Sequence, residues 1–150
     1  AVLLEHAHVV PPGPRTEEQW DEWGRPYDLR VLAAVQDAPF NVLHVCKDNN
    51  LLFCLADYPV HAINWAVGSP GNPGLRDVQL NTDKTVIGGW MNETLQTGTP
   101  AHIMAEARQA REQTGGRRWM LGPACSIPVD TPEENVRTAR NAADELQGVL

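Results

Sequence analysis

The stretch FNVLHVC, residues 40–46, decides the fold. Its nearly continuous apolar run is typical of a strand buried on both faces of a sheet, and the polar loop KDNN follows it directly. A buried strand favours Val and Ile near its end, yet this one has His44 and Cys46 there. Alternate side chains of a strand point the same way, so we predict that His44 and Cys46 face one ligand.

Short apolar runs of this kind recur along the chain and alternate with segments that carry helix signals. The other four runs are AVLLEHA (1–7), VHAINWAV (60–67), KTVIGG (84–89) and RWMLGP (118–123). Strands and helices in alternation predict a parallel sheet with right-handed crossovers, which is an α/β fold.

The first helical region has a clear start and an internal break. Thr16 and Gln19 have the spacing of a capping box, and Pro26 is expected to separate a short helix from a longer one over 25–38. Two weaker helix patterns cover 49–58 and 72–81.

Two longer helices are predicted in the second half of the chain. Thr99-Pro100 starts one and Gly115-Gly116 ends it. Thr131 and Glu134 predict a capping box at the start of the other. The apolar face of that last helix comprises Val136, Ala139, Ala143, Leu146 and Leu150.

The number of strand–helix units limits the architecture. A closed (β/α)8 barrel needs roughly 250 residues, and this chain has 150 residues and five units. Either the sheet is open, or the chain is the C-terminal portion of a barrel whose first three units are missing. The start at Ala1, within a strand and without Met, favours a fragment, and we expect residues 1–150 to form a single domain.

Composition excludes several classes of partner. The net charge is −7 with scattered basic residues, which argues against nucleic acid. No apolar run approaches the roughly 20 residues of a membrane span, and no signal sequence is apparent. Three cysteines without disulfide-like spacing fit a reducing cytoplasm.

A metal site is the strongest chemical signal in the sequence. In parallel α/β proteins reactive groups lie beyond the carboxyl ends of strands, where His44, Cys46 and the more distant Cys125 are expected. One imidazole and two thiolates suit zinc, and three protein ligands leave a fourth position for a substrate. The alternative is that Cys46 and Cys125 are packing residues, as we expect for Cys54 within its helix.

Other polar or aromatic residues at strand ends are candidates for binding substrate. His6 and His8 share a face of the first strand, but the further ligands of a dinuclear hydrolase site are not at the other strand ends. We expect one of the two to line the cleft. Asn64, Trp65 and Trp90 also follow strands, and the two indoles could line a pocket for a large flat ligand.

Five segments in this order resemble the C-terminal half of the uroporphyrinogen decarboxylase superfamily. They are RPYDLRVLAAV, NVLHVCKDNN, AINWAV, VIGGWMNETLQTGTP and RRWMLGPACSIPVDTPEENVRTAR. The resemblance runs from about Trp23 to the end of the chain and is most specific from Gly122 to Asn135. It implies a (β/α)8 barrel that is incomplete here, with about five C-terminal units, and a cytoplasmic location.

The superfamily contains two chemistries, and the resemblance is closer to one of them. Tetrapyrrole decarboxylases need no metal and have a His in the loop after the last strand, where this chain has Cys125. They also have an Asp where this chain has Asn64. Zinc-dependent methyltransferases have a His-x-Cys motif and a distant Cys, which match His44, Cys46 and Cys125.

The resemblance therefore implies a methyltransferase that holds zinc through these three residues and moves a methyl group between a corrinoid carrier protein and a small thiol. The alternatives are tetrapyrrole decarboxylation, as in porphyrin biosynthesis, and an inactive or partner-dependent piece of a barrel. A missing N-terminal barrel half is a further possible partner.

Overall fold

One parallel sheet organises the molecule. The structure is a computed structural model that describes the backbone of residues 2–6 and 16–147 and the side chains of residues 16–146. Its sheet has five parallel strands in sequential order: β1 (Val2–His6), β2 (Asn41–Val45), β3 (Ala62–Trp65), β4 (Thr85–Ile87) and β5 (Trp119–Met120). The predicted α/β fold is confirmed, and this strand order is that of an incomplete (β/α)8 barrel.

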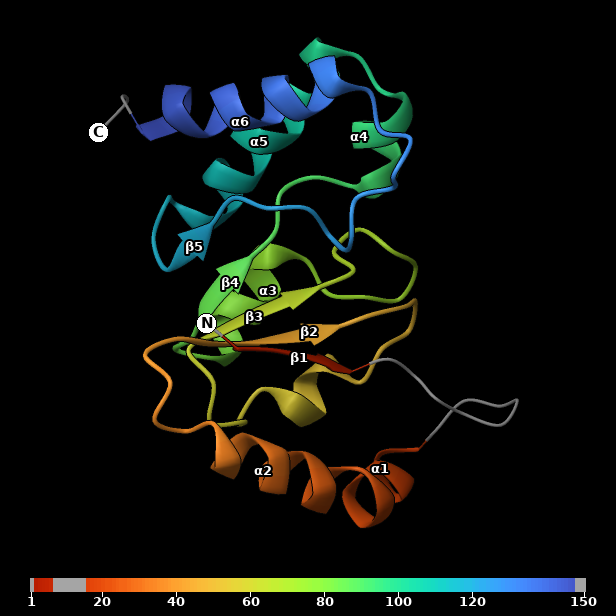
Figure 1. Cartoon of the computed structure of the whole chain (residues 1–150), viewed down its shortest axis with the longest axis vertical. Helices are drawn as coiled ribbons and strands as arrows, with labels where there is room; N and C mark the ends of the chain where they lie inside the picture. The colour runs from red at the N-terminus through yellow and green to blue at the C-terminus, as the bar shows by residue number, and fades with distance from the viewer. Residues whose placement is uncertain (1, 7–15, 148–150) are drawn as a thin grey trace.

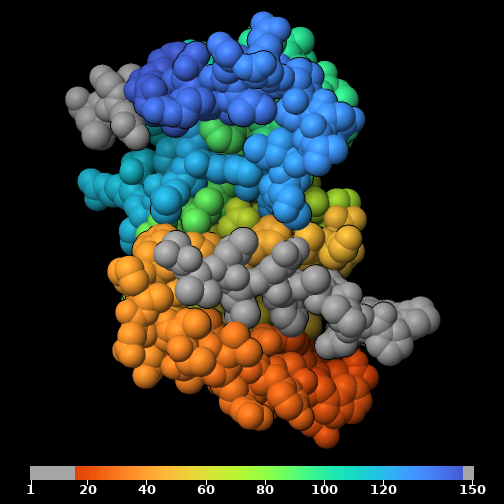
Figure 2. Space-filling view, viewed as in Figure 1, coloured from red at the N-terminus to blue at the C-terminus, as the bar shows by residue number. Residues whose placement is uncertain are grey.

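Helices lie above and below the strands along the long axis of the molecule in the view of Figure 1. They are α1 (Glu17–Trp23), α2 (Arg25–Ala34), the 3-10 helix η1 (Leu52–Leu55), α3 (Leu75–Asn81), α4 (Asn92–Thr97), α5 (Pro100–Thr114) and α6 (Glu133–Gln147). Figure 1 shows α1 and α2 below the strands and the stacked pair α5 and α6 above them. In the space-filling view these two groups form opposite ends of the molecule (Figure 2).

The residues of β2 and β3 alternate between an apolar and a polar face of the sheet. Leu43, Val45, Ile63 and Trp65 are almost completely buried in the larger core cluster, which also contains Trp20 of α1. Since neighbouring residues of a strand point to opposite faces, His44 and Asn64 lie on the other face. The sheet therefore carries an apolar core on one face and polar side chains on the other.

A smaller core cluster joins the C-terminal helices. Ile103 and Ala107 of α5 pack with Ala139 and Ala142 of α6, and Trp90 and Leu95 complete the cluster. Small alanine side chains at the contact allow the two helices to approach closely. Val136, predicted on this face, is instead 42% exposed, and Leu150 lies outside the described residues.

Most of the predicted helix starts and ends are found in the structure. Thr16 Oγ1 accepts a hydrogen bond from the Gln19 backbone at 3.3 Å, and the Gln19 side chain accepts one from Thr16, which completes the capping box. The break before α2 falls at Gly24, two residues before Pro26. Gly115 ends α5 in the left-handed conformation, with φ 61°.

Two details of the helix prediction are wrong, and one helix was not predicted. The capping box at Thr131 does not form, because its buried Oγ1 has no hydrogen-bond partner and α6 begins at Glu133. The segment 49–58 contains only η1, because the Asn50 side chain accepts the backbone N–H of Leu52 and takes the chain into a tight turn. The short helix α4 was not anticipated.

No helix among the described residues combines the length and apolar character that a membrane crossing requires.

Candidate metal centre

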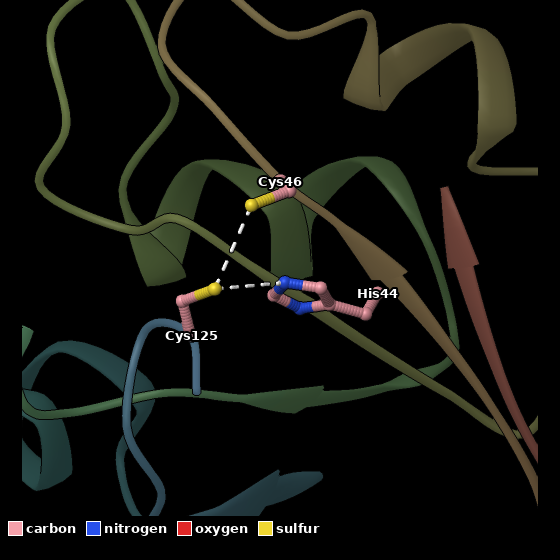
Figure 3. Close-up of side chains that lie close together, drawn as sticks. All are labelled: His44, Cys46 and Cys125. Atoms are coloured by element: carbon pink, nitrogen blue, oxygen red, sulfur yellow. Dashed lines mark hydrogen bonds between the residues drawn. The ribbon is translucent and has the colours of Figure 1, made fainter. Parts of the chain in front are cut away.

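Three soft donors from distant parts of the chain meet beyond the carboxyl ends of the strands. His44 lies in β2, Cys46 immediately follows β2, and Cys125 lies in the segment after β5. Their ligand atoms all lie within 4.8 Å of one another. Figure 3 shows the three side chains pointing toward a common centre, as the sequence predicted.

The distances between these donors suit one small cation. Cys125 Sγ lies 3.4 Å from His44 Nε2 and 3.5 Å from Cys46 Sγ. Tetrahedral zinc, with bonds of about 2.3 Å to sulfur and about 2.0 Å to nitrogen, places such donors about 3.5–3.8 Å apart. The remaining pair, His44 and Cys46, has its ligand atoms within 4.8 Å, so small shifts of the side chains would admit the ion. Both cysteines are free thiols, since a disulfide requires sulfur atoms at about 2.0 Å.

The chemistry of the donors also fits zinc. One imidazole and two sulfurs form a ligand set that binds zinc in preference to magnesium or calcium, because those ions require oxygen ligands. The described residues supply three ligands to this group. A fourth position would be available to a substrate atom, as in catalytic zinc sites.

An amide side chain on β3 holds the histidine. Asn64 pairs with His44 in the register of the sheet, and its Oδ1 lies 2.5 Å from His44 Nδ1. Asn64 Nδ2 donates to the carbonyl oxygens of Ile87 and Pro123, each at 3.0 Å. Asn64, predicted to bind substrate, thus touches a metal-ligand candidate and the segment that carries Cys125.

A second asparagine holds the segment around Cys125. The Cys125 backbone N–H donates to Asn92 Oδ1 at 3.2 Å, and Asn92 Nδ2 donates to the Ser126 carbonyl at 2.6 Å. These two bonds span the residue that carries the thiol. They fix its backbone relative to the start of α4.

The loop after Cys46 has an unusual backbone that other side chains stabilise. Lys47 and Asn49 adopt positive φ angles of 72° and 47°, a region that residues other than glycine seldom occupy. Asn50 Nδ2 donates to the Val45 and Lys47 carbonyls, and Asn72 Nδ2 donates to the Lys47 carbonyl at 2.9 Å. The turn is therefore anchored on both sides of Cys46.

Burial affects the protonation of the site. Desolvation raises the pKa of the Cys46 thiol, and the adjacent sulfur of Cys125 raises it further. The thiol form of Cys46 is therefore favoured until a cation compensates for the charge of the thiolate.

A cavity of about 290 Å³ opens beside the three donors. The residues that line it are Val42, His44, Asn64, Ile87, Pro123, Cys125 and Ser126. Among these described lining residues there is no carboxylate, lysine or arginine. The described part of the cavity lining therefore carries no fixed charge.

The two tryptophans predicted to bind substrate do not line this cavity, and that prediction is wrong. Trp65 follows Asn64 in β3 and so points to the opposite, core face, where its indole N–H donates to the Pro73 carbonyl at 2.9 Å. The Trp90 indole is buried against α5 and donates to the Ile103 carbonyl at 3.0 Å.

The side chains of the two N-terminal histidines lie outside the described part of the structure. His6 ends β1, and its backbone pairs with Val45 of β2, but the description of this strand is limited to its backbone. His8 lies outside the described residues. Their proposed contact with substrate stays a prediction.

Sequence reasoning missed Asn50, Asn72 and Asn92. Asn50 and Asn72 are in polar loops after β2 and β3, and Asn92 begins α4, a few residues after β4. A position shortly after a strand was the available signal. Asparagines are common in turns for local reasons, so the sequence does not distinguish those that connect two distant segments.

The fold and the site define an α/β protein of the barrel type with a His–Cys–Cys group that could bind a metal at the carboxyl ends of its strands. Comparison with protein families agrees with this class: the uroporphyrinogen decarboxylase (URO-D) family matches residues 13–146. The chain belongs to this family. Among curated proteins, none matches the chain.

Proposed function

We propose that this chain is the zinc-binding part of a methyltransferase that moves a methyl group between a corrinoid carrier and a thiol. The observation that carries the proposal is the convergence of His44, Cys46 and Cys125. Membership of the URO-D family supports enzymatic activity of a related kind. The resemblance of the His-x-Cys motif and the distant Cys to the zinc-dependent branch supports methyl transfer.

The three residues would hold zinc and leave room for a substrate sulfur. Bound zinc would lower the pKa of a substrate thiol, so that the thiol reacts as a thiolate near neutral pH. Two cysteine thiolates and one substrate thiolate carry three negative charges against the two positive charges of the ion. The net negative charge would keep the substrate sulfur nucleophilic.

The reaction then balances without a redox partner. The substrate thiol gives its proton to solvent, and its sulfur forms a bond to the methyl carbon. The bond between that carbon and the corrinoid cobalt breaks, and its electron pair stays on the corrinoid. The cavity beside Cys125 would hold the uncharged part of the thiol substrate.

The natural partners would be a methylated corrinoid protein and a small thiol. In the part of the chain that the structure describes, β1 and β5 are the edge strands of the sheet, and further strand–helix units at these edges would complete the barrel. Such units would form the wall opposite Asn64 and His44.

Zinc content of variants tests the metal centre. We expect nearly one zinc per purified chain, with loss of most of the metal in Cys46→Ser and Cys125→Ser, because each substitution removes a thiolate. Cys54→Ser is the matched control, since Cys54 lies in η1 and outside the donor group. Elemental analysis that finds no zinc in the parent, or equal zinc in all variants, would contradict the proposal.

Decarboxylation of a tetrapyrrole carboxylate is the second candidate, because the matching family is named for that reaction. The two candidates differ in their response to metal removal. A methyltransferase of the proposed kind loses activity when a chelator removes zinc and recovers it when zinc is restored. A decarboxylase of the metal-independent kind is indifferent to the chelator.

A further inference from the structure

We propose that Asn64 is a positioning residue that selects the tautomer of His44 and so prepares Nε2 to bind the metal. The inference rests on the metal centre of the proposed function, but not on methyl transfer itself. It starts from the three hydrogen bonds of one side chain, all to groups around the site.

The orientation of the Asn64 amide follows from its partners. Ile87 and Pro123 present carbonyl oxygens, which only accept hydrogen bonds, so the group facing them must be the amide NH2. The other end of the amide, which faces His44, is therefore the oxygen Oδ1. The opposite orientation would place an oxygen against two carbonyl oxygens.

This orientation determines where the His44 proton resides. Because Asn64 Oδ1 can only accept, the nitrogen that faces it, Nδ1, must carry the proton and donate. In a neutral imidazole the other nitrogen, Nε2, then has a free lone pair. That nitrogen is the one directed at Cys125 Sγ, 3.4 Å away, in the donor group.

The selection opposes the intrinsic preference of the ring. Neutral histidine in water favours the proton on Nε2, which is the wrong form for a metal bond through Nε2. Asn64 reverses that preference before any metal arrives, so no tautomer exchange is needed on binding. Partners of this kind are general contributors to metal affinity.

The same side chain also connects the two ligand-bearing segments. Pro123, whose carbonyl accepts from Asn64, is two residues before Cys125. Asn64 itself lies on β3, next to His44 of β2 in the register. A single amide thus links the strand of one ligand with the segment of another.

Two substitutions separate tautomer selection from simple packing. Asn64→Leu keeps the branched shape and the number of side-chain heavy atoms but has no hydrogen-bonding group, so the proton of His44 should return to Nε2 wholly or in part. Asn64→Asp still accepts from Nδ1, so the Nδ1–H form should persist although both donors to the carbonyls are lost. Asn141→Leu, at an exposed position of α6, is the control.

The experiment uses metal-free protein labelled with 15N at histidine. Long-range 1H–15N correlation spectra report which ring nitrogen carries the proton, and His44→Gln identifies the His44 signals. We expect the Nδ1–H form in the parent, the control and Asn64→Asp, and the Nε2–H form or a mixture in Asn64→Leu. Competition with a chromophoric chelator should show about 10- to 100-fold weaker zinc binding in Asn64→Leu.

The inference is overturned if Asn64→Leu keeps the Nδ1–H form, or if the parent has the proton on Nε2. If Asn64→Leu does not fold, loss of the Nδ1–H form in a folded Asn64→Asp variant overturns it equally. Because the spectra are recorded without metal, they test this inference even if the parent proves to have no methyltransferase activity.

Discussion

At the scale of single residues, polar groups at the ends of strands are held by several partners each. His44 and Cys125 are fixed by asparagine amides, which both donate and accept and can therefore join two segments. Tyr58 is the corresponding case in the core, where its hydroxyl donates to Asp28 Oδ2 at 3.1 Å. Arg25 lies 5.5 Å from the centre of the Tyr58 ring and also pairs with Asp57.

Tyr58 predicts a pH dependence of stability. Burial, and then the charge of Asp28, raises the pKa of Tyr58 above its ordinary value of about 10. The folded state therefore keeps a proton that the unfolded state releases above that pH. The stabilisation is fully present below about pH 10 and is lost as the pH rises further.

Tyr58→Phe tests this dependence. It should cost about 1–2 kcal/mol at pH 7, because the hydrogen bond to a half-buried carboxylate is lost. The difference from the parent should shrink above pH 10 in urea unfolding experiments. Tyr27→Phe, at a position 62% exposed, should match the parent throughout. A constant difference between Tyr58→Phe and the parent from pH 7 to 11 would contradict the assigned pKa shift.

At the scale of elements, the junction between α1 and α2 depends on a residue without a side chain. A Cβ added at Gly24 would lie 2.2 Å from the ring of Trp20, which is 1% exposed. The φ angle of Gly24 is −106°, which other residues adopt readily. Space for the Trp20 ring, rather than backbone conformation, therefore requires glycine here.

Gly24→Ala is expected to lower the free energy of unfolding by about 1–3 kcal/mol through overpacking. In a Trp20→Phe background the same change should cost clearly less, because the smaller ring leaves space for the methyl group. Denaturant melts of the four proteins in this double-mutant cycle measure the coupling. Additive effects would show that the contact with Trp20 is not the cause.

At the scale of the whole molecule, the sequence predicted what depends on local pattern and missed what depends on distant contacts. Side chains alternate between the two faces along β2 and the residue after it, which predicts that His44 and Cys46 lie on the same face. The position of Cys125 after the last strand predicts that it lies near them. The same alternation places Asn64 and Trp65 on opposite faces, which excludes Trp65 from the cavity. Trp65 was predicted to bind substrate because it lies at the end of a strand, but the face of the sheet to which it points was not considered.

The features that the sequence did not predict depend on contacts between residues that are far apart in the chain. Asn92 binds backbone groups more than thirty residues away, and the Asn64 side chain connects β3 with β4 and with Pro123. Neither link leaves a periodic pattern in the sequence. The short helix α4 contacts α6 and α5, and Asn135 of α6 donates to the Leu95 carbonyl.

We propose that one imidazole and two thiolates from distant segments bind a single zinc ion with one position left for a thiol. X-ray absorption at the zinc edge of the purified protein tests it most directly. We predict two sulfur ligands at about 2.3 Å and one nitrogen at about 2.0 Å, with a further sulfur appearing when a small thiol is added. A shell of nitrogen and oxygen alone, or one that added thiols do not change, would contradict this account.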